Sequence, residues 1–378
     1  MVSSGLEGVV AATTSLSHVD GERGQLVIGG YAVEELAEHA TFEETTWLLW
    51  HGELPTARQL DSFHASLAAA RTLPTPTLTL LRDSARSGLA VMDALRVGTG
   101  TLSLASDDAA GILARIPTIV AAYWRLQRGQ EPVAPRSDLG HAANYLYMLS
   151  GDPPDRERVR ALETYLNTVI DHGLNASTFT ARVITSTGSD LVSAIVGAIG
   201  ALKGPLHGGA PGPALDMVFE IGDASRAEQV LREKIEAGEK LMGFGHRVYK
   251  VRDPRADVLA RAAERMFTRG GDMSLYTLAR SVEAEAIRLL DLYKPGRRLQ
   301  TNVEFYTALL LHGLGLEVPL FTPTFAVSRV GGWLAHAFEQ RRANRIIRPQ
   351  SEYAGPRDRR WVPIADRAGA DATPRAAR

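Results

Sequence analysis

The spacing of apolar residues along this 378-residue chain predicts helices almost everywhere and leaves little room for sheet. Apolar side chains recur every three or four positions in one segment after another, whereas alternation of apolar and polar residues is scarce. The helices predicted in this way cover residues 42–51, 56–70, 138–149, 157–172, 189–202, 223–240, 255–266, 281–290, 303–311 and 323–343. The predicted fold class is therefore mainly α.

A minor β element is expected near the N-terminus. The clearest strand pattern is Gly24–Ile28, ahead of two glycines and a helix that begins near Val33. Two helix ends are also marked, because Asp138 has the character of an N-cap and Gly151 that of a stop. Residues 204–212 are too rich in glycine and proline for regular helix and join two helical blocks.

The composition is that of an ordinary globular protein. Its 42 basic and 43 acidic residues nearly cancel, which argues against nucleic acid or an acidic membrane surface as the main partner. The chain has no cysteine, so disulfides and thiolate metal sites are excluded. Met1–Glu7 lacks the pattern of a signal peptide, and the longest apolar run, Leu191–Leu202, falls short of the roughly 20 residues that span a bilayer. We predict a cytoplasmic protein.

Two histidines stand among glycines, which leave room for a bound molecule because they lack a side chain. His207 lies in Gly-Pro-Leu-His-Gly-Gly, residues 204–209, where a neutral histidine can donate a hydrogen bond to a developing enolate oxygen. The alternative is a loop histidine that caps the preceding helix. His246 follows Gly243 and Gly245. Together the two segments predict a catalytic cleft rather than a core.

His246 also begins a basic run that includes Lys250 and Arg255. A glycine-rich turn beside arginine and lysine suits phosphates and carboxylates. The alternative is a solvated charged face, which is the usual meaning of such a run.

Four further residues are candidates for binding or proton transfer. His172 lies in a polar cluster where a helical pattern ends, although it would also suit the C-terminal end of the helix dipole. Glu304 has apolar and aromatic neighbours, and burial would raise its basicity, but most such glutamates face solvent. Arg329 lies within an apolar helix and needs an anionic partner. Arg348 is a weaker candidate, since arginine is common in this chain.

The sequence predicts no metal site. The ten histidines include neither an HExxH motif nor a pair at metal-ligand spacing. His336 and Glu339, which lie close together on a predicted helix, are typical of a surface pair. Neither of the common glycine-rich nucleotide-binding loops occurs.

The order of these motifs resembles the citrate synthases, including the 2-methylcitrate synthases. The resemblance rests on Gly-Pro-Leu-His-Gly-Gly, Gly-Phe-Gly-His, Asp-Pro-Arg and the helix with Arg329, and it extends over nearly the whole chain. It implies a mostly α-helical homodimer with a citrate synthase-like two-domain fold. The large domain would comprise residues 1–218 and 326–378, the small domain 219–325, and the tail 366–378 would be frayed. The active site would lie between the domains, and closure would exclude water.

The resemblance also implies roles for the candidate residues. His207 would stabilise the enol of an acyl-coenzyme A thioester, and His246 would polarise the ketone of oxaloacetate. No cofactor would be bound permanently, because coenzyme A enters as the thioester co-substrate. The residues implied to bind oxaloacetate are His172, Arg255, Arg329 and Arg348, the last in the partner's site, and those near coenzyme A are Lys250, Gly243 and Gly245.

One position departs from the family pattern. Glu304 stands in Asn-Val-Glu-Phe-Tyr, where the family's catalytic base is usually an aspartate. The carboxylate is kept on a side chain that is longer by one methylene. Either the site has adjusted to keep the base within reach of its proton, or the enzyme is slow, or it favours a different acyl group. Three hypotheses follow: a citrate synthase that uses acetyl-coenzyme A, a 2-methylcitrate synthase that uses propionyl-coenzyme A, and a catalytically weak paralogue that binds these ligands.

Overall fold

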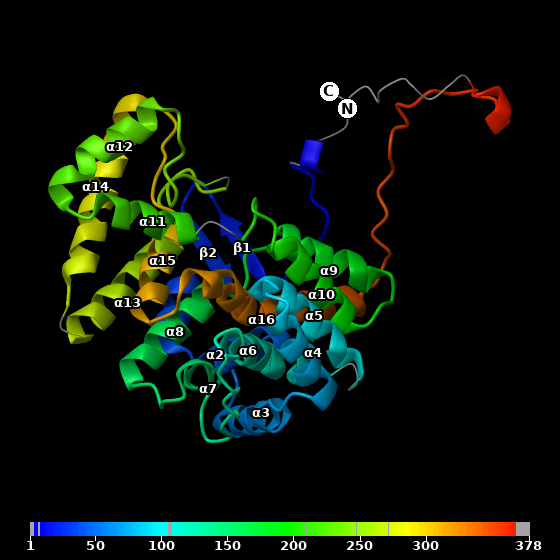
Figure 1. The fold of residues 1–378 in the computed structure, drawn as a ribbon, viewed down its shortest axis with the longest axis horizontal. Helices are drawn as coiled ribbons and strands as arrows, with labels where there is room; N and C mark the ends of the chain where they lie inside the picture. Colours follow the sequence, from blue (N-terminus) through cyan, green and yellow to red (C-terminus); the bar gives the residue numbers. More distant parts are fainter. Residues whose placement is uncertain are drawn as a thin grey trace. The chain divides into compact units, whose positions relative to one another are not determined.

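The computed structural model of the chain describes residues 4–6, 8–104, 108–208, 211–246, 248–270 and 272–367, and its regular structure is almost entirely helical (Figure 1). This confirms the predicted fold class. The helices are α1 (Val33–His39), α2 (Phe42–His51), α3 (Ala57–Ala70), α4 (Thr75–Arg86), α5 (Val91–Gly100), α6 (Ala109–Leu126), α7 (His141–Ser150), α8 (Arg156–Val169), α9 (Ala176–Ser186), α10 (Leu191–Leu202), α11 (Pro211–Ile221), α12 (Ala227–Glu236), α13 (Pro254–Gly270), α14 (Ser274–Tyr293), α15 (Val303–Gly313) and α16 (Phe321–Arg342).

A small antiparallel sheet near the N-terminus is the predicted β element. Its strands β1 (Ser17–Asp20), β2 (Gln25–Ile28) and β3 (Tyr31–Ala32) pair in the order β1-β2-β3, with Ser17 opposite Ile28. The sheet matters for the site because β1 carries Ser17 to the turn that follows α8.

The helix ends agree with the sequence at some positions and differ at others. Gly151 ends α7 in the left-handed conformation, as predicted. Asp138 is not the N-cap of α7, because its carboxylate pairs with the Arg136 guanidinium instead. α8 ends at Val169, so His172 lies in a turn beyond the helix.

The sequence pattern does not predict α4, α5, α6, α9 or α11. α6 is buried on almost every side, so it shows no apolar stripe against a polar face. α11 begins at Pro211, a position where proline is favoured because its missing N–H would have no partner in the helix. The segment 204–212 is therefore irregular as far as Gly208, while its last two residues are helical.

α16 runs through the middle of the helical assembly and is buried along most of its length (Figure 1). It packs against α2, α6, α8, α9 and α10. Its close approach to the end of α8 depends on Gly332, where a side-chain carbon would lie 2.2 Å from the carbonyl oxygen of Ile170. The helix is thus held against the turn that carries His172.

α11 to α15 contact one another and group together at one end of the assembly (Figure 1). The predicted small domain, 219–325, contains most of these helices. Its two boundaries fall within α11 and α16.

Contacts divide the chain into two units, residues 13–347 and residues 1–12 with 348–378. In its described part, the second unit has only the short 3₁₀ helices Ser4–Leu6 and Ile364–Asp366 as regular structure. The predicted frayed tail, 366–378, lies mostly outside the described residues. Apart from Arg348, every predicted site residue lies in residues 13–347.

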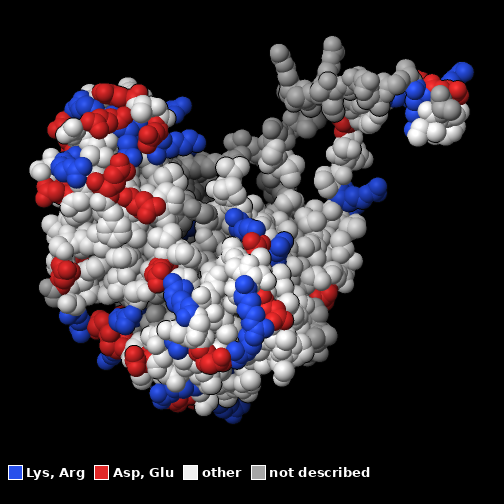
Figure 2. All heavy atoms as spheres, in the orientation of Figure 1, with Lys and Arg blue, Asp and Glu red and all other residues white. Residues whose placement is uncertain are grey.

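Acidic and basic side chains are interspersed on the face drawn in Figure 2. Among the described helices, none by itself is both long enough and apolar enough to cross a bilayer. α15 and residues 318–342 meet that test only together, as a pair bent by 117°.

Candidate functional site

The turn after α8 is held from both sides. Asp171 is fully buried, and its Oδ2 accepts a hydrogen bond from Ser17 Oγ at 2.5 Å. The same Ser17 Oγ accepts the backbone N–H of Gly173 at 2.9 Å. Gly173 has a φ of +60°, a conformation that favours glycine. His172 lies between these two anchored residues, so its backbone is fixed by the β1 hydroxyl.

His172 is a neutral side chain in this setting. Its Nε2 lies 3.1 Å from the hydroxyl oxygen of Tyr249, which is buried. Burial, together with the nearby positive charges of Arg255 and Arg329, holds the pKa of His172 well below its usual range. A neutral imidazole can bind a ligand through a hydrogen bond without carrying charge.

The loop around His246 depends on two glycines. Gly243 and Gly245 have φ values of +89° and +83°, and a side-chain carbon at Gly243 would lie 2.9 Å from Cβ of Phe305. Tyr249 and Val248 donate their backbone N–H groups to His246 Nδ1, both at 3.0 Å. Because Nδ1 accepts both bonds, the proton of neutral His246 must be on Nε2. Burial lowers the pKa of His246 to about 4, which keeps the ring neutral.

Arg255 is fixed by Asp253, and both side chains are buried. Nε and Nη2 of Arg255 donate to Oδ1 and Oδ2 of Asp253 at 3.0 and 2.8 Å. Asp253 Oδ2 also accepts the backbone N–H of Val303, the first residue of α15, at 3.2 Å. One carboxylate thus fixes both the guanidinium and the start of the helix that carries Glu304.

His246 and Arg255 present two donors to the same space. Nη2 of Arg255 lies 3.5 Å from Nε2 of His246. Arginine has no acceptor, and His246 Nε2 carries its proton, so these two groups cannot bond to each other. They can both donate to one ligand oxygen placed between them, as a ketone or carboxylate would provide.

Glu304 is a half-buried carboxylate in the first turn of α15. Asn302 caps this helix by accepting the Glu304 N–H at 3.0 Å, and its amide donates to the carbonyl of Gly245 at 2.7 Å. Burial raises the pKa of Glu304 to about 7, although the charges of Arg255 and Arg329 oppose the shift. A carboxylate with this pKa is suited to accept a proton near neutral pH.

Arg329 is a buried arginine whose charge is not neutralised by an ion pair. Its Nε donates to the carbonyl of Val169 at 2.7 Å, and it forms no ion pair with any carboxylate in the described ranges. Burial lowers the pKa of Arg329 to about 10, so it remains charged. A buried guanidinium of this kind favours an anionic ligand.

His207 is oriented by Ser177. Its Nε2 accepts the backbone N–H of Ser177 at 3.3 Å and lies 2.8 Å from the Ser177 hydroxyl, which in turn accepts the indole N–H of Trp333 at 3.2 Å. Burial lowers the pKa of His207 to about 4, and the charge of Arg329 adds to the effect. Because Nε2 accepts the Ser177 N–H, the neutral ring carries its proton on Nδ1, which can donate to an oxygen.

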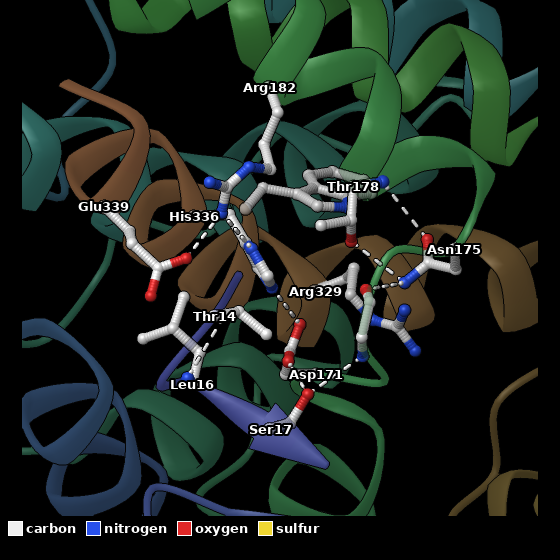
Figure 3. Close-up of polar contacts among 12 residues, drawn as sticks. Thr14, Leu16, Ser17, Asp171, Asn175, Thr178, Arg182, Arg329, His336 and Glu339 are labelled. Atoms are coloured by element: carbon white, nitrogen blue, oxygen red, sulfur yellow. Dashed lines mark hydrogen bonds and ion pairs between the residues drawn. The ribbon is translucent and has the colours of Figure 1, made fainter. Parts of the chain in front are cut away.

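One face of α16 contacts Val169, Asp171 and Ser177, which lie close to His172 and His207. Arg329, Trp333 and His336 follow one another at helical spacing, and Figure 3 shows Arg329 and His336 on either side of Asp171. The interpretation of His336 and Glu339 as a surface pair is wrong: His336 is fully buried, and Glu339 binds Arg182 at 2.6 Å. The spacing of His336 and Glu339 suggested a surface helix, but other helices cover α16 on the side where a surface helix would meet water.

The catalytic and binding roles of all the predicted site residues stay predictions, including those of Lys250 and Arg348. Lys250 is exposed, and its backbone N–H donates to Gly21. Arg348 is exposed and belongs to the second unit. Gly243 and Gly245 have a conformational role in the loop that carries His246, and their contact with coenzyme A stays a prediction. In the described parts of the chain, no group of side chains is suited to hold a metal ion.

The sequence pattern did not single out Ser177, Asp253 or Tyr249. Each lies within a segment that it did mark, near His172 or in the run from His246 to Arg255. Their contacts depend on partners brought together by the fold, and sequence spacing carries no signal for those.

The match to known proteins covers almost the whole chain. The family model described as "Citrate synthase, C-terminal domain" matches residues 5–350. The chain therefore belongs to the citrate synthase family, which comprises condensing enzymes of the acyltransferase type. This confirms the family resemblance and the citrate synthase-like fold.

Individual relatives are similar over more than nine-tenths of their length. The chain is 42% identical to citrate synthase 2 of Bacillus subtilis over 96% of this chain and 99% of that protein. It is 41% identical to 2-methylcitrate synthase of Mycobacterium tuberculosis over 94% and 91%, respectively. A solved complex of Thermoplasma acidophilum citrate synthase with carboxymethyl coenzyme A and oxaloacetate superposes with a TM-score of 0.88 at 31% identity, covering 97% of this chain and 100% of that one.

Proposed function

We propose that this protein is a citrate synthase, which condenses acetyl-coenzyme A with oxaloacetate and water to give citrate and coenzyme A. The observation that carries the proposal is the pair of donors on His246 and Arg255, which need a shared oxygen. The ketone and adjacent carboxylate of oxaloacetate offer such oxygens, and Arg329 supplies positive charge for the dianion. His172 adds a neutral contact.

The condensation begins with enolisation of the thioester. Glu304 takes a proton from the acyl methyl group, and the enol oxygen accepts a hydrogen bond from Nδ1–H of His207. The nucleophilic carbon of this enolate then attacks the ketone carbon, and His246 Nε2–H stabilises the negative charge that develops on the ketone oxygen. That oxygen becomes a hydroxyl by taking up one proton, which balances the proton that Glu304 removed from the methyl group and later releases. Water hydrolyses the resulting citryl thioester and releases coenzyme A.

The remaining parts of the proposal follow from membership of the family. Residues 1–218 with 326–378 would form a large domain and 219–325 a small one, which closes over the substrates. Lys250, Gly243 and Gly245 would lie on the coenzyme A side. The enzyme would be a cytoplasmic homodimer with Arg348 of each subunit in its partner's site.

Thiol release with purified protein, oxaloacetate and either acetyl- or propionyl-coenzyme A tests the function. We expect release with acetyl-coenzyme A; faster release with propionyl-coenzyme A would make the protein a 2-methylcitrate synthase. Release with neither would favour a catalytically weak paralogue.

The variant Glu304→Gln tests the base. It should abolish turnover and spare oxaloacetate binding measured by calorimetry, whereas the surface control Glu317→Gln should keep both. Near-normal turnover of Glu304→Gln would refute the assignment of Glu304 as the base.

A further inference from the structure

His336 and Asp171 form a fully buried pair behind the proposed oxaloacetate site. Nε2 of His336 lies 3.1 Å from Oδ1 of Asp171, and both side chains are inaccessible to solvent. Nδ1 of His336 lies 3.1 Å from Nη1 of Arg182. Because arginine can only donate, Nδ1 is an acceptor, and the ring's single proton is on Nε2, where it donates to Asp171.

The array continues along α16 from His336 to Glu339, because Arg182 contacts both of these residues. Nη1 of Arg182 donates to Oε2 of Glu339 at 2.6 Å, and Nε of Arg182 donates to Gln340 at 3.1 Å. Glu339 also accepts the backbone N–H of Ser15 at 2.8 Å. Figure 3 shows the line from Glu339 through Arg182 and His336 to Asp171. Because Nη1 of Arg182 can only donate to Nδ1, this contact fixes the tautomer of the imidazole.

Asp171 connects His336 to the turn that carries His172. Its Oδ1 accepts from His336 and its Oδ2 from Ser17, whose oxygen also accepts the N–H of Gly173. Burial by itself would raise the pKa of Asp171, but its contacts with His336 and Ser17 bring the pKa below its usual value. The residue next in the chain is His172. Its position is therefore set by a carboxylate whose orientation depends on both donors.

We propose that His336 is a positioning residue for oxaloacetate binding, which acts through Asp171 to hold His172 in place. The inference rests on the proposed role of His172 as an oxaloacetate ligand. A buried carboxylate that loses one of its two donors must rotate or take up water, and either change displaces the His172 backbone. The thioester side is held separately, through Ser177 and His207.

A pair of substitutions separates the hydrogen bond from simple packing. In His336→Phe the ring volume is kept but the donor to Asp171 is lost, and we expect KM for oxaloacetate to rise roughly tenfold or more. His336→Gln can place an amide N–H near the former Nε2 and should restore most of the affinity. KM for the thioester should change less than about threefold in both variants, since neither substitution removes the hydrogen bonds between Ser177 and His207 on the thioester side.

His141→Gln is the matched control. His141 is also a buried histidine, but it lies in α7 against Phe42 and outside the array. All three variants should lose thermal stability, but of the three only His336→Phe should raise KM for oxaloacetate substantially. A purely structural role predicts instead that His336→Phe and His141→Gln affect both substrates alike, and that result would overturn the proposal.

Two further measurements keep the inference testable if His336→Phe fails to fold. Side-chain ¹⁵N NMR of wild-type protein at pH 7 should show His336 with its proton on Nε2, and a protonated Nδ1 would contradict the proposal. Asp171→Asn should raise KM for oxaloacetate as His336→Phe does, and an unchanged KM would also contradict it. Absence of any turnover of oxaloacetate by wild-type protein would instead refute the proposed function.

Discussion

Ser177 orients His207 through two of its own atoms, the backbone N–H at 3.3 Å and the hydroxyl oxygen at 2.8 Å from the same imidazole nitrogen. The backbone bond alone fixes the tautomer, because an N–H can only donate. The hydroxyl adds a second contact and satisfies the indole N–H of Trp333. The His207 ring is therefore held by Ser177 in the first turn of α9, and Ser177 is in turn contacted by Trp333 of α16.

Ser177→Ala should reduce kcat without changing oxaloacetate affinity. The backbone bond remains, so His207 keeps its tautomer, but the ring gains freedom and Trp333 loses its acceptor. The loss of one such neutral hydrogen bond should lower kcat roughly fivefold to tenfold. Steady-state kinetics with varied thioester measures this. Thr180→Ala, which removes a hydroxyl bound to Ala176 on the same helix, should have no effect; an equal loss there would contradict the prediction.

The rate of condensation should depend on the ionisation of Glu304. The base must be deprotonated, and its pKa lies at about 7. The pKa values of His207 and His246 lie at about 4, so both remain neutral above pH 6. We therefore expect kcat/KM for the thioester to fall about tenfold for each pH unit below the pKa of Glu304 and to level off above that pKa. A profile that is flat between pH 5.5 and 8.5 would contradict this.

Glu163 should make the stability of the protein pH-dependent. Burial raises its pKa to about 7, and the charge of Glu43 adds to the shift, while its side chain is 15% exposed. The folded state binds this proton more tightly than the unfolded state, so its stabilising effect is complete below about pH 4.5 and lost as pH rises through 7. The loss amounts to about 3 kcal/mol.

Urea unfolding of Glu163→Gln at pH 5 and pH 8 tests this prediction. The variant lacks the titrating group, so its stability should fall less between the two pH values than that of the wild type. Glu157→Gln is the control, because Glu157 lies on the same helix as Glu163. This substitution removes an ion pair with Arg269, and the variant should follow the wild type. A parallel pH dependence of all three proteins would contradict the prediction.

Two adjacent glycines in α16 should respond differently to alanine. At Gly332 the new carbon would lie 2.2 Å from the Ile170 carbonyl oxygen, and this backbone atom cannot move without shifting the turn. At Gly331 it would meet the side chains of Ile170 and Thr46 at 3.1 and 3.2 Å, which can adjust. Alanine itself favours helix by about 1 kcal/mol. Gly332→Ala should therefore lower Tm and oxaloacetate affinity, whereas Gly331→Ala should keep both within a small change. Scanning calorimetry measures Tm and titration calorimetry measures oxaloacetate affinity. Equal changes in the two variants would contradict the prediction.

Local sequence patterns predicted those elements whose signals are local. α2 is preceded by Thr41, whose side chain forms a capping box with Glu44, and its boundaries match. α6 escaped prediction because it is surrounded by other helices, so its apolar residues follow no periodicity. Asp138 was misassigned because its competing partner, Arg136, is an equally local residue that the capping pattern ignores.

The same distinction applies to the site. Histidines among glycines were recognisable because the glycines are needed within the same loop, as at Gly243. His336 was not recognisable, because its partners Asp171 and Arg182 lie more than a hundred residues away in the chain. Local spacing marked the candidate site residues, whereas the residues that contact them from behind are defined by tertiary packing.

The face of α16 that carries Arg329, Trp333 and His336 also limits how this sequence can change over time. Each residue of a helix turns the following ones by about 100°, so a single insertion or deletion between Arg329 and His336 would turn one of them away from the site. Substitutions can alter these contacts one at a time, but a change of length would disturb both substrate sides at once. We therefore expect the interval from Arg329 to His336 to keep its length in functional relatives even where its residues differ.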